Sequence, residues 1–365
     1  MAEWKECLLG DLITFQRGHD LPKSKMSGNG YPVVGSNGII GFHNEYTTEY
    51  PSITVGRSGN VGKPYIVYGR SWSHNTSLYI KEFKGTDPVF IYYFLQTLDL
   101  GNYAGGSAVP TLNRNHIHSL NVRVPADVST QEKIANTLKA LDDKIDKNTD
   151  INKNLLQQLH VLYLRLFCDS AMDTPLGDVV ATTSGGTPSR KHDEYYSDSS
   201  ICWVKSKELL GNYIHETEEH INDLAIKKSS AKLLPEHSVL IAMYGATVGA
   251  YGVISKPMTC NQAVCALLCN ENYPYTYLFQ IAYESQQKFI NLAVGSAQQN
   301  ISQVLIKQLN LHSDLDIIQK FHGLVLPMHK EIESLQAENM RLSALRDNLL
   351  PKLMSGELDV SDIEI

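Results

Sequence analysis

The chain has 365 residues, 42% of them hydrophobic, with a mean hydropathy of −0.21, so it is long enough for a large core and for two or more domains. Its net charge of −7 argues against a protein that coats nucleic acid by bulk attraction. No apolar stretch reaches the roughly 18 to 20 residues of a membrane helix, and no apolar signal segment opens the chain. Six irregularly spaced cysteines favour reduced thiols. We therefore expect a cytoplasmic protein without membrane contact.

Residues 1–128 are expected to form a β-rich unit. The tripeptide Leu-Gly-Asp at positions 9–11 precedes a short apolar run of the kind that starts a strand. Residues 52–55 and 64–68 follow as short β segments separated by glycine.

A long helix is predicted over residues 129–168. Its seam positions advance in alternate steps of four and three, which is the pattern of a coiled coil. These positions are Ile134, Leu138, Leu141, Ile145, Asn148, Asn152, Leu155, Leu159, Leu162 and Leu166. A rod of roughly 55 Å follows from about 1.5 Å per residue. Such a length indicates a spacer or a scaffold.

Residues 173–314 repeat the first unit. Leu-Gly-Asp recurs at positions 176–178, and Gly-Ser-Ala of positions 106–108 recurs at 295–297. Short β segments are predicted at 238–243 and 251–254, in places that match those of the first copy. The sequence therefore predicts two diverged copies of one strand-rich unit.

A second long helix is predicted over residues 315–355, before a tail at 356–365. Its seam positions are Phe321, Val325, Met328, Ile332, Leu335, Asn339, Leu342, Arg346, Leu349 and Leu353, with Arg346 as one charged member. Asn152 and Asn339 occupy equivalent seam positions, and a lone polar seam residue usually sets register and orientation. We predict that these two amides meet across an antiparallel helix pair; the alternative is that each contacts water. The expected fold is α+β: two globular domains in a pseudo-twofold repeat, each followed by a long helix, with the helices in an antiparallel coiled coil.

Polar loops suited to binding occur in both units. The turn at 185–191 combines two hydroxyls with two cations, and loop amides could read base edges. The candidate DNA-binding residues of the first unit are Arg17, Arg57, Ser58, Asn60, His74, Asn113 and Arg114. Those of the second are Thr187, Ser189, Arg190, Lys205, Lys207, Tyr244, Gln298, Gln299 and Asn300, near the anchoring ring of Trp203. Each position is also compatible with an ordinary solvated loop.

Catalytic and metal motifs find little support. Glu82 and Lys84 have a spacing found in nucleases, but no aspartate between residues 49 and 82 could share a metal, so a solvated strand end is the prediction. Cys260, Cys265 and Cys269 match no common zinc spacing and lie among core-type residues. We predict no catalytic residue, no bound metal and no cofactor bound by this chain.

Two β-rich units, each opening with Leu-Gly-Asp and closing in a heptad helix, resemble the specificity subunit of type I restriction-modification systems. In the second half the matching features are the turn at 185–190, Trp203, Leu-Leu-Pro at 233–235, and the segments 244–249, 261–263 and 295–297. The first helix opens with a matching Gln131, Lys133 and Ile134, and residues 349–358 match the family's ending. The first unit departs from the pattern at residues 16–21, as expected for a domain that reads a different sequence.

The resemblance implies a DNA-reading subunit that is not itself an enzyme. Each domain would contact one half of a split target in double-stranded DNA, while the helices set the gap and dock two methyltransferase subunits, which use S-adenosylmethionine. Motor-nuclease subunits would join for restriction. Residues 313–365 carry 5 Lys+Arg against 10 Asp+Glu, which suits a surface for protein partners. Two alternatives remain: a coiled-coil adaptor that binds proteins, and a stand-alone enzyme acting on nucleic acid.

Overall fold

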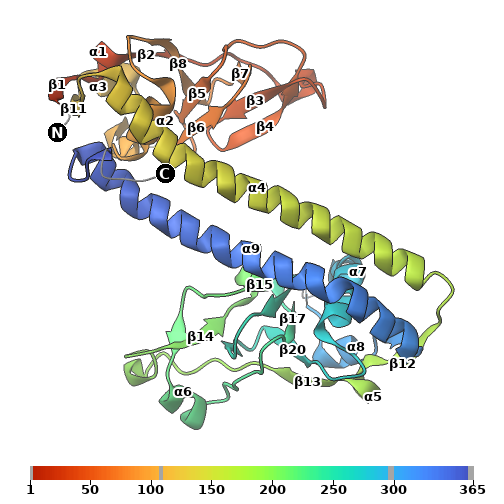
Figure 1. Cartoon of the computed structure of the whole chain (residues 1–365). Coiled ribbons are helices and arrows are strands. Elements are labelled where there is room, and N and C mark those ends of the chain that lie inside the picture. The colour runs from red at the N-terminus through yellow and green to blue at the C-terminus, as the bar shows by residue number, and fades with distance from the viewer. Residues whose placement is uncertain (1–2, 107–109, 295–299, 361–365) are drawn as a thin grey trace. The chain divides into compact units, whose positions relative to one another are not determined.

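A computed structural model of the chain describes residues 3–106, 110–294 and 300–360 (Figure 1). The chain forms two compact units: unit 1 contains residues 1–146 and 340–365, and unit 2 contains residues 147–339. Two long helices, α4 (Val128–Leu166) and α9 (Leu315–Ser355), contribute to both units. Among the described residues, no helix is both long and apolar enough to cross a membrane.

Unit 1 is built on small open sheets. Its strands are β1 (Trp4–Leu8), β2 (Ile13–Arg17), β3 (Tyr31–Gly35), β4 (Gly38–His43), β5 (Ser52–Gly56), β6 (Pro64–Val67), β7 (Trp72–Ser73), β8 (Ser77–Phe83), β9 (Ala104–Gly105), β10 (Thr111–Leu112) and β11 (Asn121–Pro125). Its short helices are α1 (Leu9–Leu12), α2 (Pro88–Gln96) and α3 (Arg114–His118). An antiparallel sheet has the order β2-β8-β5-β6. A second, mixed sheet has the order β4-β3-β7, in which β3 pairs antiparallel with β4 and parallel with β7. The β segments predicted at 52–55 and 64–68 are confirmed as β5 and β6.

The core of unit 1 joins the sheet to the helices. Phe90 and Phe94 of α2 are buried together with Ile134 and Leu138 from the first turns of α4 and Leu353 from the end of α9. These helix positions belong to the predicted seam, but here they pack against the globular domain as well as against each other. The apolar stripe is therefore shared between helix pairing and docking of the domain.

Unit 2 repeats this design with a larger sheet. Its strands are β12 (Met172–Pro175), β13 (Ala181–Ser184), β14 (Ile201–Val204), β15 (Tyr213–Ile214), β16 (His220–Ile221), β17 (Val239–Ala242), β18 (Tyr251–Ile254), β19 (Thr259–Cys260), β20 (Val264–Leu268) and β21 (Asn310–His312). Its helices are α5 (Leu176–Val179), α6 (Asp223–Lys228), α7 (Tyr275–Val294) and α8 (Gln303–Lys307). Five strands form a mixed sheet in the order β13-β20-β17-β18-β15, and three form a sheet in the order β16-β14-β19. The β segments predicted at 238–243 and 251–254 are confirmed as β17 and β18.

The core of unit 2 also includes both long helices. Tyr163 of α4 and Phe167, the residue after this helix, contact Phe321 of α9 through their rings, with centroids 6.0 and 5.7 Å apart. All three join the cluster formed by the five-stranded sheet and α7. Cys265 is fully buried in the same cluster and Cys260 in a neighbouring one, which confirms the prediction for these two cysteines. Cys269, predicted with them, is only partly buried against the first cluster. All six cysteines lie in the described part of the chain and are free thiols.

The repeated tripeptide Leu-Gly-Asp makes the same contacts in both units. Leu9 and Leu176 are fully buried at the start of α1 and α5, and their amides donate to the carbonyls of Leu120 and Leu309, each at 2.8 Å. In both copies the strand before this helix pairs antiparallel with the strand before a long helix, β1 with β11 and β12 with β21. The tripeptide therefore ties the start of each domain to its end.

Glycine in the middle of the tripeptide is required by close helix contacts. A Cβ at position 10 would lie 3.1 Å from the carbonyl oxygen of His118, and one at position 177 would lie 2.8 Å from Cβ of Lys307. These neighbours belong to α3 and α8, the equivalent helices of the two copies. A larger residue would push each pair of short helices apart.

The long helices run antiparallel, and their pairing corrects one prediction. In unit 2, the partner of Asn148 is Asn339, with Nδ2 2.9 Å from Oδ1, whereas Tyr163, further along α4, contacts Phe321. Asn152 therefore faces a point nearer the start of α9 than Asn339, and the structure pairs Asn148, not Asn152, with Asn339. The sequence matches Asn152 with Asn339 because they are 187 residues apart, like every pair of equivalent seam positions in the two helices. In an antiparallel pair, equivalent positions do not generally face each other.

The charged seam member Arg346 has carboxylate partners. In unit 1 its Nη1 lies 2.7 Å from Oδ1 of Asp142 on α4, and its Nη2 lies 2.8 Å from Oδ1 of Asp347 on its own helix. Asp142 also accepts a hydrogen bond from the hydroxyl of Tyr93 in α2 at 2.5 Å. The guanidinium therefore joins both long helices and the domain in one polar network.

Candidate nucleic-acid interface

The turn that follows β13 is held in place by two glycines. A Cβ at position 185 would lie 2.2 Å from the carbonyl oxygen of Cys260, and one at position 186 would lie 2.3 Å from the backbone nitrogen of Ala231. The indole nitrogen of Trp203 donates to the carbonyl of Gly186 at 3.0 Å. Only glycine fits between these backbones, so the local sequence fixes where the exposed residues of the turn begin.

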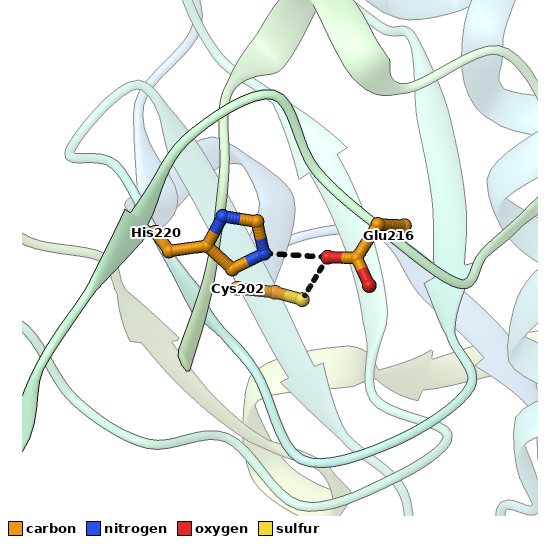
Figure 2. Close-up of side chains that lie close together, drawn as sticks. All are labelled: Cys202, Glu216 and His220. Atoms are coloured by element: carbon orange, nitrogen blue, oxygen red, sulfur yellow. Dashed lines mark hydrogen bonds and ion pairs between the residues drawn. The ribbon is translucent and has the colours of Figure 1, made fainter. Parts of the chain in front are cut away.

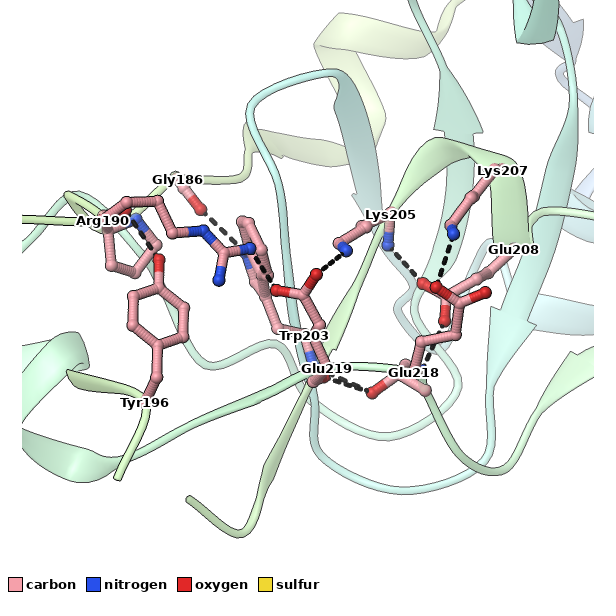
Figure 3. Close-up of polar contacts among 11 residues, drawn as sticks. Gly186, Arg190, Tyr196, Trp203, Lys205, Lys207, Glu208, Glu218 and Glu219 are labelled. Atoms are coloured by element: carbon pink, nitrogen blue, oxygen red, sulfur yellow. Dashed lines mark hydrogen bonds and ion pairs between the residues drawn. The ribbon is translucent and has the colours of Figure 1, made fainter. Parts of the chain in front are cut away.

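Arg190 of this turn lies over aromatic rings (Figure 3). Its guanidinium carbon is 4.3 Å from the ring centroid of Tyr196 and 5.4 Å from that of Trp203. Trp203 is only 3% exposed, and the hydroxyl of Tyr196 donates to the carbonyl of Pro188 at 2.7 Å. The rings are thus fixed, while the side chain of Arg190 remains 57% exposed.

One carboxylate binds two of the candidate cations. Glu219 forms ion pairs with Arg190 through one oxygen and with Lys205 through the other (Figure 3). The hydrogen bond from Lys205, and then that from Arg190, lower the pKa of the Glu219 carboxyl despite partial burial. Both cations therefore meet an ionised carboxylate before any ligand arrives.

Lys207 has its own acidic neighbour. It forms an exposed ion pair with Glu218 at the surface. Glu208, in the same short 3-10 turn, accepts from the backbone amides of Lys205 at 2.6 Å and Glu218 at 2.9 Å. The positive charges of this face are therefore offset by acidic residues, and the face carries little net charge.

The other candidates of unit 2 are less closely grouped. Thr187 and Ser189 are exposed in the same turn as Arg190. Tyr244, 44% exposed, shares an isolated β-bridge with Asn300, so the structure brings these two together. Gln298 and Gln299 lie outside the described residues.

In unit 1 the structure gathers cations around α3. Arg57, Asn113 and Arg114 line one hollow of about 370 Å³, and Arg114 also lines a second hollow with Arg17. Arg17 lies 3.7 Å from Asp20, with both side chains exposed. This group therefore presents several cations on one surface of the unit.

The remaining candidates of unit 1 differ in whether their side chains already make hydrogen bonds within the unit. Ser58 bridges Thr111 through the backbone, and Asn60 is exposed with its amide donating to the hydroxyl of Tyr65 at 3.2 Å. Asn113 caps α3 by accepting from the amide of Asn115 at 3.0 Å. His74 makes two internal contacts through its ring, to Thr76 at 3.0 Å and to the carbonyl of Leu21 at 3.3 Å. The structure gives His74 and Asn113 local structural roles.

Among the described residues, one group offers three kinds of metal ligand: Cys202, Glu216 and His220, whose ligand atoms lie within 4.8 Å of one another (Figure 2). One oxygen of Glu216 accepts from the thiol at 3.0 Å and contacts Nε2 of the imidazole at 2.6 Å, and its other oxygen lies 3.2 Å from Nζ of Lys256. An ammonium ion already in place disfavours a second cation at this carboxylate. The group is best described as a hydrogen-bond network.

This network also positions Glu219. Partial burial alone would raise the pKa of Glu216, but hydrogen bonds from Cys202, His220 and Lys256 outweigh it and lower the pKa to about 2. Successive residues of a strand point to opposite faces, so Cys202 anchors the loop at 216–220 on one face of β14 while Trp203 supports Arg190 on the other. Sequence reasoning missed Glu219 because the acidic run around it resembles a solvated loop.

Each of the two domains thus carries exposed candidate side chains: several arginines around α3 in unit 1, and Arg190 beside a carboxylate in unit 2. A family model described as "Type I restriction modification DNA specificity domain" matches residues 1–158 and again residues 171–313. The chain therefore belongs to the family of type I restriction-modification specificity subunits, whose general function is recognition of a DNA target and whose members are not catalytic.

Individual relatives agree with this assignment. The specificity subunit of the type I restriction enzyme MjaIX from Methanocaldococcus jannaschii is 26% identical over 75% of this chain and 70% of its own length. That of HindI from Haemophilus influenzae is 22% identical over 74% of this chain and 77% of its own length. A crystal structure of a specificity subunit from M. genitalium covers 96% of each chain at 15% identity with a TM-score of 0.69, which shows a shared fold.

Proposed function

We propose that this chain reads a split DNA target, with each domain contacting one half-site. The observation that carries the proposal is the duplication: each unit has its own core and its own exposed polar side chains. These lie around Arg57, Arg114 and Arg17 in unit 1 and around Arg190 in unit 2. Side chains of these types contact phosphates and base edges. Two separate surfaces on two separate domains suit a target in two parts.

In this proposal the long helices set the gap between half-sites and dock two methyltransferase subunits. Several apolar side chains on the helices are exposed: Ile151, Val161, Leu164, Leu324, Met340 and Leu345 are each 45–51% exposed. In unit 2, α4, α7 and α9 also border a hollow of about 730 Å³, whose lining includes Leu210 at 76% and Tyr283 at 44% exposure. Exposed apolar groups beside a hollow favour a protein partner over water.

The partners supply the chemistry. The methyltransferase subunits would use S-adenosylmethionine to methylate adenine, this chain would bind no cofactor, and motor-nuclease subunits would join for restriction. Because the target is genomic DNA, we place the assembly in the cytoplasm. The acidic C-terminal region suits contact with basic partner surfaces, which would also complete a DNA channel that this chain, at a net charge of −7, does not provide.

The test is single-molecule mapping of methylated adenines in a host that carries this chain with its neighbouring methyltransferase, compared with the same host lacking this chain. A split motif with a constant gap, present only when the chain is present, is the expected result. An unchanged methylation pattern, with the complex shown to assemble, would favour a protein-binding adaptor instead.

A further inference from the structure

We propose that Arg190 reads a guanine in the half-site contacted by unit 2, and that Glu219, Tyr196 and Trp203 are positioning residues that hold its guanidinium for this purpose. The inference rests on the proposed function, because it requires that unit 2 contacts DNA. It adds to that function the identity of one base, the residue that reads this base, and the side chains that orient that residue.

The first argument is that Arg190 is fixed before it meets a ligand. Its guanidinium lies over the rings of Tyr196 and Trp203 and is bonded to Glu219 (Figure 3). Both rings are bonded to the turn that carries Arg190, through the carbonyls of Pro188 and Gly186. A side chain held from three sides loses little rotamer entropy on binding, which favours a contact with strict geometry.

The second argument concerns donors. A guanidinium has five N–H groups in a planar fork, and Glu219 contacts Arg190 through Nη2 alone. The side chain is 57% exposed, so other N–H groups of the fork can reach a ligand. Guanine presents two acceptors, O6 and N7, on its major-groove edge, and a bidentate arginine matches them.

The third argument is charge. Glu219 offsets one of the two positive charges of Arg190 and Lys205, and Lys205 is only 20% exposed. A site built to attract phosphate gains from uncompensated charge, because phosphate binding depends on cations that replace counterions. A carboxylate between the two cations weakens phosphate attraction but leaves the hydrogen-bonding fork intact. The arrangement therefore suits a neutral base edge better than the backbone.

Unit 1 supplies a matched control. Arg70 lies 4.5 Å from the ring centroid of Tyr46, and its Nε lies 2.9 Å from Oε2 of Glu49. Glu49→Gln therefore makes the same chemical change as Glu219→Gln, at an arginine–tyrosine–glutamate contact in the other unit. It is expected to leave the bases of the half-site read by unit 2 unchanged.

The experiment maps methylated adenines at single-base resolution in hosts that carry the full chain with its methyltransferase, as wild type, Glu219→Gln, Arg190→Lys or Glu49→Gln. In wild type, one position of the half-site read by unit 2 should require guanine. Arg190→Lys and Glu219→Gln should each relax that position, raising use of other bases there by roughly 10- to 100-fold, the scale of one bidentate contact. The remaining positions should stay as strict as in wild type, which also reports that the variants fold and assemble.

Three results would overturn the inference. A uniform fall in methylation across all positions in the Arg190 and Glu219 variants would identify a phosphate contact or a structural role. A wild-type half-site without any guanine requirement would exclude the proposed reading. Methylation that does not depend on this chain at all would overturn the proposed function together with the inference, so the two failures are distinguishable.

Discussion

His329 shows how burial controls the protonation of a single side chain. It lies on α9 in unit 2, is 1% exposed, and its Nδ1 is 2.9 Å from the hydroxyl of Tyr213. The rings of Phe279 and Tyr275 surround it, with centroids 5.3 and 5.7 Å away. Burial, and to a smaller extent the positive charges of His322 and His237, lower its pKa to about 3.

We expect this histidine to make unit 2 less stable in mild acid. The unfolded chain takes up a proton on this residue below about pH 6.5, whereas the folded chain does not until about pH 3, so the contribution is complete above pH 6.5 and is lost as the pH falls. The free energy of unfolding should fall by up to about 1.4 kcal/mol per pH unit from this residue. Urea unfolding near pH 7 and near pH 5.5 measures it.

His329→Gln should reduce the number of protons taken up on unfolding in mild acid by about one. Burial also lowers the pKa of His312 and of His215, so part of the pH dependence remains in this variant. An identical slope in His329→Gln and wild type would show that the residue is protonated in the folded state.

At the scale of elements, the centre of the helix pair is polar. Asn148 is fully buried, and its Nδ2 donates to Asn339 at 2.9 Å and to Glu338 at 2.7 Å. Asn152, one turn further along α4, is 7% exposed. The Oδ1 atoms of both asparagines are buried without a hydrogen-bond partner among the described residues. The two asparagines therefore differ in Nδ2, which makes two interhelical hydrogen bonds in Asn148.

Asn148→Ala should lower the free energy of unfolding by about 1–3 kcal/mol, because it removes two hydrogen bonds, one of them to a carboxylate. Asn152→Ala should cost clearly less, because it does not remove the two interhelical hydrogen bonds that Nδ2 of Asn148 donates. Urea denaturation of both variants checks the order. Equal losses would mean that Asn152 has a partner, such as a bound water, that balances its oxygen.

Helix length should control the gap in the DNA target. Removing one heptad from each helix, residues 145–151 and 336–342, preserves the antiparallel pairing and shortens the pair by about 10 Å, or about three base pairs. Methylation mapping should then show a shorter gap with unchanged half-site bases. An unchanged gap in an assembled complex would show that the length of the helices does not set the spacing of the target.

At the scale of the whole molecule, the two units are built alike and have separate cores. Exchange of residues 173–312 for the same segment of another family member should change one half of the target and leave the other half and the gap unchanged. Methylation mapping of the hybrid decides this, and changes in both halves would show that the units do not read independently.

Sequence alone determined the architecture of this protein. The repeated Leu-Gly-Asp motif, the glycine-separated strands and the alternate steps of four and three in the helices predict two β-rich units and paired helices, because these patterns arise from local geometry and burial. The structure confirms them, from α1 and α5 to α4 and α9.

Tertiary structure alone decided which side chains meet. The partner of Asn339 depends on the register of an antiparallel pair, and sequence offset does not report that register. Glu219 becomes the shared partner of Arg190 and Lys205 only because β14 and the loop at 216–220 fold beside the turn. Contacts between residues far apart in the chain depend on three-dimensional packing. The periodicity of the sequence indicates only which face of a helix or strand each residue occupies.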